Sequence, residues 1–427
     1  MLLLFMLAIF FALLFFQQPL VVSLGLPSVI YLLLKGMPLT LVSQRIFTGI
    51  DIYLLLAIPL FALAGDLMNS GKLTDRMVDF AKALIGRARG GLAGVTVLTS
   101  MFFSGITGSG AADASATGSL LIPMMKKAGY PASFSAALTA IAAIVGPIIP
   151  PSIVFIMYGA LSRASVGDLF IAGIVPGVMM SMAHLATALM ISRRRNYEAG
   201  EPTNFGKIVR TGAKSLPALT IPAAMVGGIA FGILTPTEAG AVAVLLAVVL
   251  GSFFYRALTV SAAVKSGYRV GIEIADTMLI IGASNLLAWI LTIEKVPIHL
   301  AGAVLSVSDS PFLVLLMINL ILLVVGMFLD TFPALIILTS ILLPLAGSVG
   351  VDPIHFGVII SLNLMIGAVT PPVGILLFIA NRIANAELVE TLRELMPFLV
   401  ASIVVLMLVT YVPFLTSGVV ALVHGRF

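Results

Sequence analysis

The sequence predicts an all-α polytopic membrane protein built as an inverted repeat, with two re-entrant helical hairpins and two proline-broken helices. The composition is the first reason: 60% of the 427 residues are hydrophobic and only 10% are charged, whereas a soluble domain carries roughly 25% charged residues. The second reason is that apolar stretches long enough to cross a bilayer recur along the chain. The third is that two apolar blocks are interrupted by polar residues and two others by double prolines, at matching spacing.

Ten apolar stretches are expected to form full membrane spans, since about 20 apolar residues cross the bilayer as a helix. In chain order they are 1–16, 19–34, 52–70, 134–161, 168–192, 215–233, 236–255, 273–293, 354–380 and 397–417. Segments 72–87 and 386–396 are amphipathic, which predicts interfacial helices at the membrane surface. The apolar start has no basic region, so we expect no cleaved signal peptide.

Two further apolar blocks, 91–125 and 312–347, are interrupted at their middles. The first interruption is Gly105–Gly110 and the second is Asp330–Pro333. Each block could form two spans or one re-entrant hairpin. A polar turn at membrane depth needs protein or water around it, and this favours the hairpin.

Basic residues orient these elements, because short cytoplasmic loops carry an excess of Lys and Arg. The best assignment places all but five of the 23 basic residues in the cytoplasm. The five outside are Lys35, Arg45, Arg163, Lys295 and Arg426. The two hairpins then enter from opposite faces, both termini lie outside, and we expect a multi-pass protein of the bacterial inner membrane.

An internal repeat supports the inverted architecture. Adding 221 to a position in the first half reaches a like residue in the second: Gly105 and Gly326, Pro123 and Pro344, Gly146 and Gly367, Pro150-Pro151 and Pro371-Pro372. Opposite loop charges on the two copies indicate an inverted-topology repeat, which is typical of many secondary transporters. Chance matching of apolar sequence is the alternative, but one offset aligns a hairpin proline and both double prolines.

Each half offers oxygen ligands for a dehydrated cation. A double proline breaks a helix and frees carbonyl groups near mid-membrane, which must find a partner. With side-chain oxygens at the hairpin tips, these carbonyls predict one sodium site per half and an anionic substrate between the tips. The predicted sodium ligands are Ser104, Thr107, Gly108, Ser109, Gly146, Ile149, Pro150, Gly326, Asp330, Thr331, Gly367, Val369 and Thr370.

The predicted substrate-binding residues are Thr107, Ser109, Asp113, Pro150, Asp330 and Thr370. An ionised carboxylate in a membrane costs several kcal/mol unless it is paired, so both aspartates are interpreted as functional. For Asp113 a bracing role inside the hairpin stays open. The structural alternative for the whole set is plain kinks, with Ser and Thr bonded to carbonyls one turn back; the symmetric pair of breaks argues against it.

Other classes of function are disfavoured. The chain has no cysteine, so it has no disulfide or zinc–thiolate site. Gly71-Lys72 and Gly206-Lys207 lack the rest of a Walker A motif, so ATP is not the expected energy source. No enzymatic activity and no nucleic-acid partner are expected. An intramembrane aspartyl protease would also use two aspartates, but no Gly-x-Gly precedes Asp330. A channel is the other rival class.

Three motifs resemble the large membrane subunit of tripartite ATP-independent periplasmic (TRAP) transporters: Phe103–Asp113, Gly146–Ser152 and Gly367–Gly374. The resemblance covers nearly the whole chain. It implies the ion-transporter superfamily fold, an elevator-type mechanism driven by sodium, a small four-helix membrane subunit and a periplasmic substrate-binding protein.

The hairpin serines and aspartates of that family correspond here to Thr107, Ser109, Asp113 and Asp330, with threonine at 107 where serine is commoner. The chain looks most like the sialic-acid type, which implies uptake of a small-molecule carboxylate through the lipid membrane. Uptake of C4-dicarboxylates by the same mechanism is the alternative.

The expected domain organisation alternates scaffold and transport core. Residues 1–90 hold scaffold helices and an interfacial helix, and 193–311 hold the scaffold helices of the second repeat. The first core repeat, 91–192, contains the hairpin 91–125 and the broken helix 134–161. The second, 312–380, contains the hairpin 312–347 and the broken helix 354–380, and 381–427 form an interfacial and a C-terminal helix.

Overall fold

The computed structural model describes residues 1–16, 18–86, 88–197, 199 and 202–425. Within these ranges the chain is helical and has no β-strand, only an isolated bridge between Arg89 and Ala199. Eight helices of this part are long and apolar enough to cross a membrane. Of the basic residues counted above, Arg87 and Arg426 lie outside the described residues.

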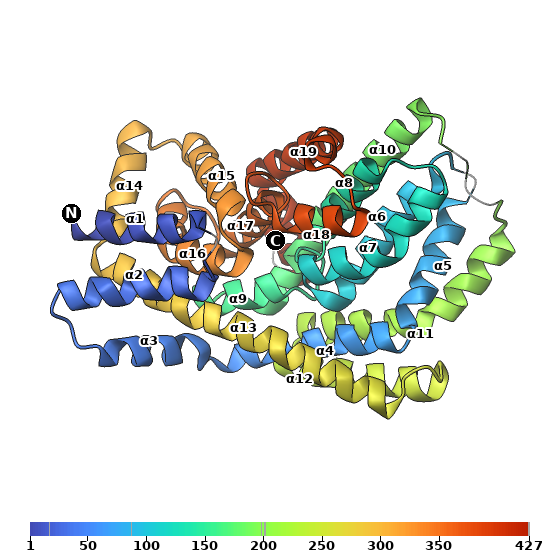
Figure 1. Cartoon of the computed structure of the whole chain (residues 1–427), viewed down its shortest axis with the longest axis horizontal. Coiled ribbons are helices and arrows are strands. Elements are labelled where there is room, and N and C mark those ends of the chain that lie inside the picture. The colour runs from blue at the N-terminus through green and yellow to red at the C-terminus, as the bar shows by residue number, and fades with distance from the viewer. Residues whose placement is uncertain (17, 87, 198, 200–201, 426–427) are drawn as a thin grey trace.

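The first half contains ten α-helices within its described part. They are α1 (Leu2–Phe15), α2 (Leu20–Leu34), α3 (Thr40–Ile50), α4 (Ala57–Ser70), α5 (Leu73–Ile85), α6 (Gly91–Thr107), α7 (Gly110–Lys127), α8 (Ala132–Ala143), α9 (Ile153–Ser162) and α10 (Val166–Arg194). Helix α4 packs on α12 and α13 of the second half, and these helices run with α3 along one long side of the molecule (Figure 1).

The second half repeats the pattern. Its helices are α11 (Phe205–Ala230), α12 (Pro236–Val249), α13 (Val260–Ile293), α14 (Val296–Val307), α15 (Pro311–Phe328), α16 (Thr331–Ser348), α17 (Pro353–Gly367), α18 (Ile375–Ala384), α19 (Leu388–Tyr411) and α20 (Ser417–Val423). Shifting α7 by 221 positions reproduces the bounds of α16, and the shifted start of α8 is the start of α17.

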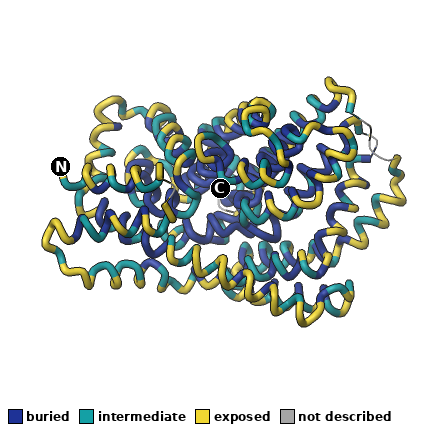
Figure 2. The backbone as a smooth tube through the Cα atoms, viewed as in Figure 1, coloured by how far each residue is buried: buried dark blue, intermediate teal, exposed yellow. Residues whose placement is uncertain are grey.

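Both predicted hairpins and both predicted helix breaks are present, which confirms the fold class. Helices α6 and α7 form the first hairpin, and α15 and α16 form the second. The first broken helix consists of α8 and α9 and the second of α17 and α18, because the double prolines have no N–H to continue the ladder. Every residue of α8 from Ser133 to Ala143 is buried, and buried residues gather at the centre of the molecule (Figure 2).

The predicted full spans at 1–16 and 19–34 are wrong in length. Helix α1 has 14 residues and α2 has 15, whereas a spanning helix needs about 17–25. The segment 386–396, predicted as a separate interfacial helix, is instead the first part of the unbroken 24-residue helix α19. Helices α3 and α14 were not predicted, because 11 and 12 residues are too few to stand out as spans.

Candidate functional site

The tip of the first hairpin lies directly against the first helix break. Helix α6 ends at Thr107, Gly108 turns the chain with a φ of 58°, and the Ser109 hydroxyl caps α7 by accepting from the Ala112 N–H at 3.4 Å. A β-carbon on Gly108 would lie 2.7 Å from the carbonyl oxygen of Pro151. Glycine is therefore required here both for the positive φ and for the close backbone approach.

At Gly146 the first helix break contacts the same hairpin tip a second time. A β-carbon on Gly146 would lie 3.4 Å from the Ser109 carbonyl oxygen, and one on Gly105 would lie 3.7 Å from that of Pro150. In the described part of the chain, the carbonyl oxygens of Gly146, Ile149 and Pro150 accept no hydrogen bond. Buried carbonyl groups need partners, so this break leaves oxygens suited to a cation.

At its closest approach the second hairpin meets its break through the backbone of two glycines. A β-carbon on Gly367 would lie 2.6 Å from the carbonyl carbon of Gly326. The Val373 N–H donates to the Met327 carbonyl at 3.3 Å, which ties the break to the end of α15. The structure thus brings the predicted ligands Gly326 and Gly367 into direct contact.

At the second tip, Asp330 is the N-cap residue of α16 and Thr331 is the first residue of that helix. The Asp330 side chain makes no capping hydrogen bond. Across the tip, the carbonyl oxygens of Val369 and Thr370 accept no hydrogen bond within the described residues.

Each site has a hydroxyl that donates its proton to a carbonyl one helical turn earlier. The Ser104 hydroxyl donates to the Ser100 carbonyl at 2.7 Å, and the Thr370 hydroxyl donates to the Ile366 carbonyl at 2.7 Å. A hydroxyl that donates to a carbonyl keeps its lone pairs free to accept. Both oxygens therefore fit a cation ligand, although the same bonds also fit ordinary back-bonding in a helix.

A cavity of about 470 Å³ reaches the first tip from the scaffold side. It lies between α4 and α13 on one wall and α6 and α7 on the other, within the usual volume range of small-molecule sites. Thr107 and Ser109 line it, as does Phe332, two residues beyond Asp330. The cavity is therefore the candidate substrate site.

The scaffold wall of this cavity carries polar residues that the sequence analysis did not identify as site residues. They are Asp66 and Asn69 of α4 and Arg269 and Glu273 of α13. A charged residue within an apolar span is the sequence signal that could have found Asp66.

Not every predicted substrate residue reaches the cavity. Pro150, Asp330 and Thr370 do not line it, and Asp113 is completely buried inside the first hairpin. The hydroxyls of Ser100 and Thr117 lie beside the Asp113 carboxylate, but neither carboxylate oxygen makes a hydrogen bond of normal geometry in the described structure. The Asp113 backbone carbonyl accepts from the Thr117 hydroxyl at 2.7 Å.

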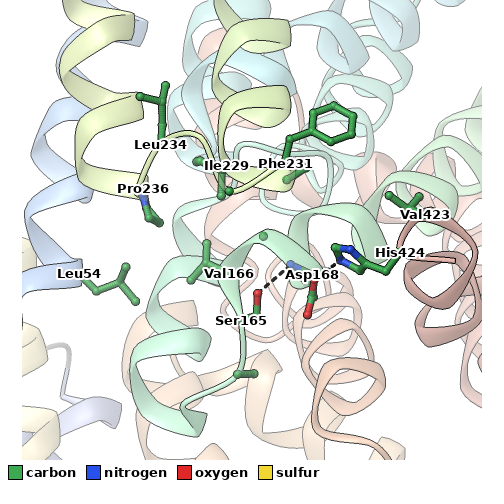
Figure 3. A pocket seen from close by; sticks show the side chains of 14 residues that line it. Leu54, Ser165, Val166, Asp168, Ile229, Phe231, Leu234, Pro236, Val423 and His424 are labelled. Atoms are coloured by element: carbon green, nitrogen blue, oxygen red, sulfur yellow. Dashed lines mark hydrogen bonds and ion pairs between the residues drawn. The ribbon is translucent and has the colours of Figure 1, made fainter. Parts of the chain in front are cut away.

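A second hollow of about 640 Å³ lies at the start of α10 (Figure 3). There the Asp168 carboxylate lies 2.8 Å from the His424 ring, and the Ser165 hydroxyl accepts from the Asp168 N–H at 3.2 Å. None of the predicted site residues lines this hollow. The smaller cavity remains the candidate site because it touches the hairpin tip.

Two hairpins facing two broken helices inside a bundle of membrane helices define a membrane carrier, in the class of secondary transporters with internal repeats. The chain belongs to the family "Tripartite ATP-independent periplasmic transporter, DctM component", whose model matches residues 7–415. The family resemblance of the hairpin motifs is confirmed. The protein is thus a multi-pass inner-membrane transport component and not an enzyme.

Its relatives are named for different substrates. The chain is 40% identical over 402 residues to the isethionate TRAP transporter permease protein DctMQ of Oleidesulfovibrio alaskensis, covering 92% of this chain and 62% of that protein. It is 37% identical to the sialic acid TRAP transporter large permease SiaM of Vibrio cholerae, covering 94% of each. It is 36% identical to the C4-dicarboxylate TRAP transporter large permease DctM of Pseudomonas aeruginosa, covering 92% of each.

Among solved structures, the YdaH transporter of Alcanivorax borkumensis has a similar fold, with a TM-score of 0.60 and 13% sequence identity. The match covers 90% of this chain and 88% of that one. At this identity the similarity concerns the fold alone.

Proposed function

We propose that the protein couples the inward flow of sodium ions to the uptake of an organic acid, with sialic acid as the first candidate substrate and a C4-dicarboxylate as the alternative. The observation that carries the proposal is that each hairpin tip meets a helix break with free carbonyl oxygens. Among the described residues, the carbonyls that accept no hydrogen bond are those of Gly146, Ile149 and Pro150 in the first break and of Val369 and Thr370 in the second. Unwound backbone of this kind coordinates sodium in other transporters with repeats.

The ligand sets follow from the two tips. For the first sodium ion we assign the Ser104 hydroxyl and the carbonyls of Gly146, Ile149 and Pro150, with the tip residues 107–109 closing the site. For the second we assign the Thr370 hydroxyl and the carbonyls of Gly326 and Val369, with Gly367 allowing the approach and Asp330 and Thr331 at the tip. All of these ligands are oxygen atoms, as a hard cation prefers.

The substrate is an anion in this proposal. Helices α7 and α16 begin at the two tips, and helix N-termini stabilise negative charge. Relatives are named for isethionate, sialic acid and C4-dicarboxylate, all of which are anions at neutral pH. The volume of about 470 Å³ suits a molecule of this size.

The transport step is an elevator movement of the hairpins and broken helices against the scaffold, formed by helices such as α2 and α12. Ion binding orders both tips and completes the substrate site, so that the empty and the fully loaded carriers move while partly loaded ones are disfavoured. A small four-helix membrane subunit and a periplasmic substrate-binding protein are the proposed partners; the tripartite family supports this assignment.

The test is uptake into proteoliposomes that contain this chain and its membrane partner, with the binding protein and labelled sialic acid or C4-dicarboxylate outside. An inward sodium gradient should drive saturable uptake, and replacing sodium with potassium should abolish it. Uptake that continues without sodium would refute the coupling. A conductance that does not saturate with substrate would indicate a channel instead.

A further inference from the structure

The scaffold wall of the cavity carries a charge cluster that the sodium and substrate assignments leave unused. Asp66 lies on α4, and Arg269 and Glu273 lie one turn apart on α13. All three line the cavity that also holds Thr107 and Ser109. A solute that leaves the first tip on the scaffold side therefore passes this cluster.

The contact between Arg269 and Asp66 leaves most of the guanidinium available. Arg269 Nη1 lies 3.3 Å from Asp66 Oδ1, longer than the roughly 2.7–2.9 Å of a strong charge-assisted bond. The Arg269 side chain is 61% exposed and that of Asp66 only 17%. Arginine has five N–H donors, and among the described residues this is its one ion pair.

Asp66, in contrast, depends on this contact. Its second oxygen, Oδ2, is buried and has no hydrogen-bond partner within the described residues. Asp66 therefore holds one edge of the guanidinium from the protein side, while the exposed edge faces the cavity. The Arg269 guanidinium thus has N–H donors available on the side of the cavity. These donors are suited to a second carboxylate, because the fork geometry of the guanidinium matches carboxylate oxygens.

We infer that Arg269 binds the carboxylate of the transported anion on its way between the hairpin tips and the cytoplasm. This inference rests on the proposed function. The cytoplasmic side follows from the loop charges: α4 ends next to Lys72 and α13 begins near Lys265, both assigned inside. Arg269 is thus a transient binding residue for the substrate and not part of either sodium site.

The charge balance of the cluster makes this binding weak, as a release path requires. Asp66 and Glu273 contribute two negative charges against the one positive charge of Arg269. An incoming carboxylate is attracted by the Arg269 guanidinium and repelled by the Glu273 carboxylate, which lies one helical turn away on α13. The anion is therefore attracted to Arg269 and then leaves for the cytoplasm.

The substitution Arg269→Gln tests the inference. The matched control is Lys265→Gln, which removes one positive charge one turn earlier on α13, at a residue that does not line the cavity. Sodium-driven uptake by the Arg269→Gln protein should lose about tenfold in maximal rate, the low end of what one hydrogen bond to a charged group contributes. The equilibrium affinity for the substrate in detergent should change less than twofold, because the tips are untouched. The Lys265→Gln protein should have the same maximal uptake rate and the same substrate affinity as the unmodified protein.

Two further variants separate recognition from stability. Arg269→Lys should restore part of the rate, since lysine keeps the charge without the fork. Asp66→Asn combined with Arg269→Gln removes the unpaired carboxylate and should recover thermal stability but not the rate. A normal rate in Arg269→Gln, or full recovery in the double variant, would overturn the inference. Absence of sodium-driven uptake in the unmodified protein would instead overturn the proposed function.

Discussion

The first helix break is enclosed in the core, whereas the second break opens to the surface at Pro372 and Val373. The hydroxyl assigned to the first ion belongs to the hairpin, Ser104, and the one assigned to the second belongs to the break, Thr370. Their equivalents under the repeat of 221 residues are Val325 and Ile149. The comparison teaches that the repeat preserves the backbone framework while each copy supplies its own polar side chains.

The two copies also differ in the hydrogen bonding of their buried polar side chains. In the second copy the Asn363 side chain donates to Asn319 at 2.6 Å, and Asn319 donates to Thr410 at 3.2 Å. In the first copy the carboxylate of Asp113 has no such partner in the described structure. The network of the second copy is partly satisfied, since the Asn363 side-chain oxygen has no partner among the described residues. Burying the Asp113 carboxylate costs more, because a charge needs stronger compensation than an amide.

The largest effect on uptake is expected at the hairpin-tip position where the first copy has a hydroxyl and the second copy has a carboxylate. Ser109 and Asp330 are equivalent N-cap residues. Asp330→Ala should reduce sodium-dependent uptake by at least about 100-fold, because no other carboxylate is assigned to the tips. The substitution Ser109→Ala should reduce sodium-dependent uptake far less.

Asp309→Ala is the control, since Asp309 is an exposed acid just before the second hairpin. Normal uptake and normal sodium dependence in the Asp330→Ala protein would remove Asp330 from the site.

Removing one hydroxyl from each copy should lower sodium affinity without abolishing transport. Ser104→Ala and Thr370→Val should each raise the half-saturating sodium concentration by about tenfold, which corresponds to roughly 1.4 kcal/mol. Titration of uptake with sodium measures this, and Ser340→Ala on α16 serves as the control. If only one of the two variants responds, the copies do not each hold an ion.

The smallest effects concern thermal stability and should differ between the two copies. Asn363→Leu leaves Asn319 without its donor, which costs about 1–3 kcal/mol and should lower the melting temperature by a few degrees. Asp113→Asn removes a buried, unpaired carboxylate and should leave the melting temperature unchanged or raise it. Thermal unfolding in detergent measures both, and a large loss in Asp113→Asn would show that its carboxylate is stabilised.

The hairpins and breaks could be predicted from the sequence, because glycine and proline determine the conformation of their own backbone. Gly108 and the double prolines at 150 and 371 determine local conformation whatever packs around them. The pairing of Arg269 with Asp66 could not be predicted, because it depends on how α4 packs against α13. The same holds for Asn319 and Asn363, which read as isolated polar residues in apolar runs.

The Gly326–Gly367 contact also has a consequence for how relatives of this protein diverge. Since the closest atoms in that contact belong to the main chains of two glycines, the approach depends little on the chemistry of neighbouring side chains. Residues around the candidate substrate cavity can then be exchanged during evolution while the geometry of the proposed ion site stays constant. Under the proposed function, one coupling site would serve relatives that carry sulfonates, sugar acids and dicarboxylates.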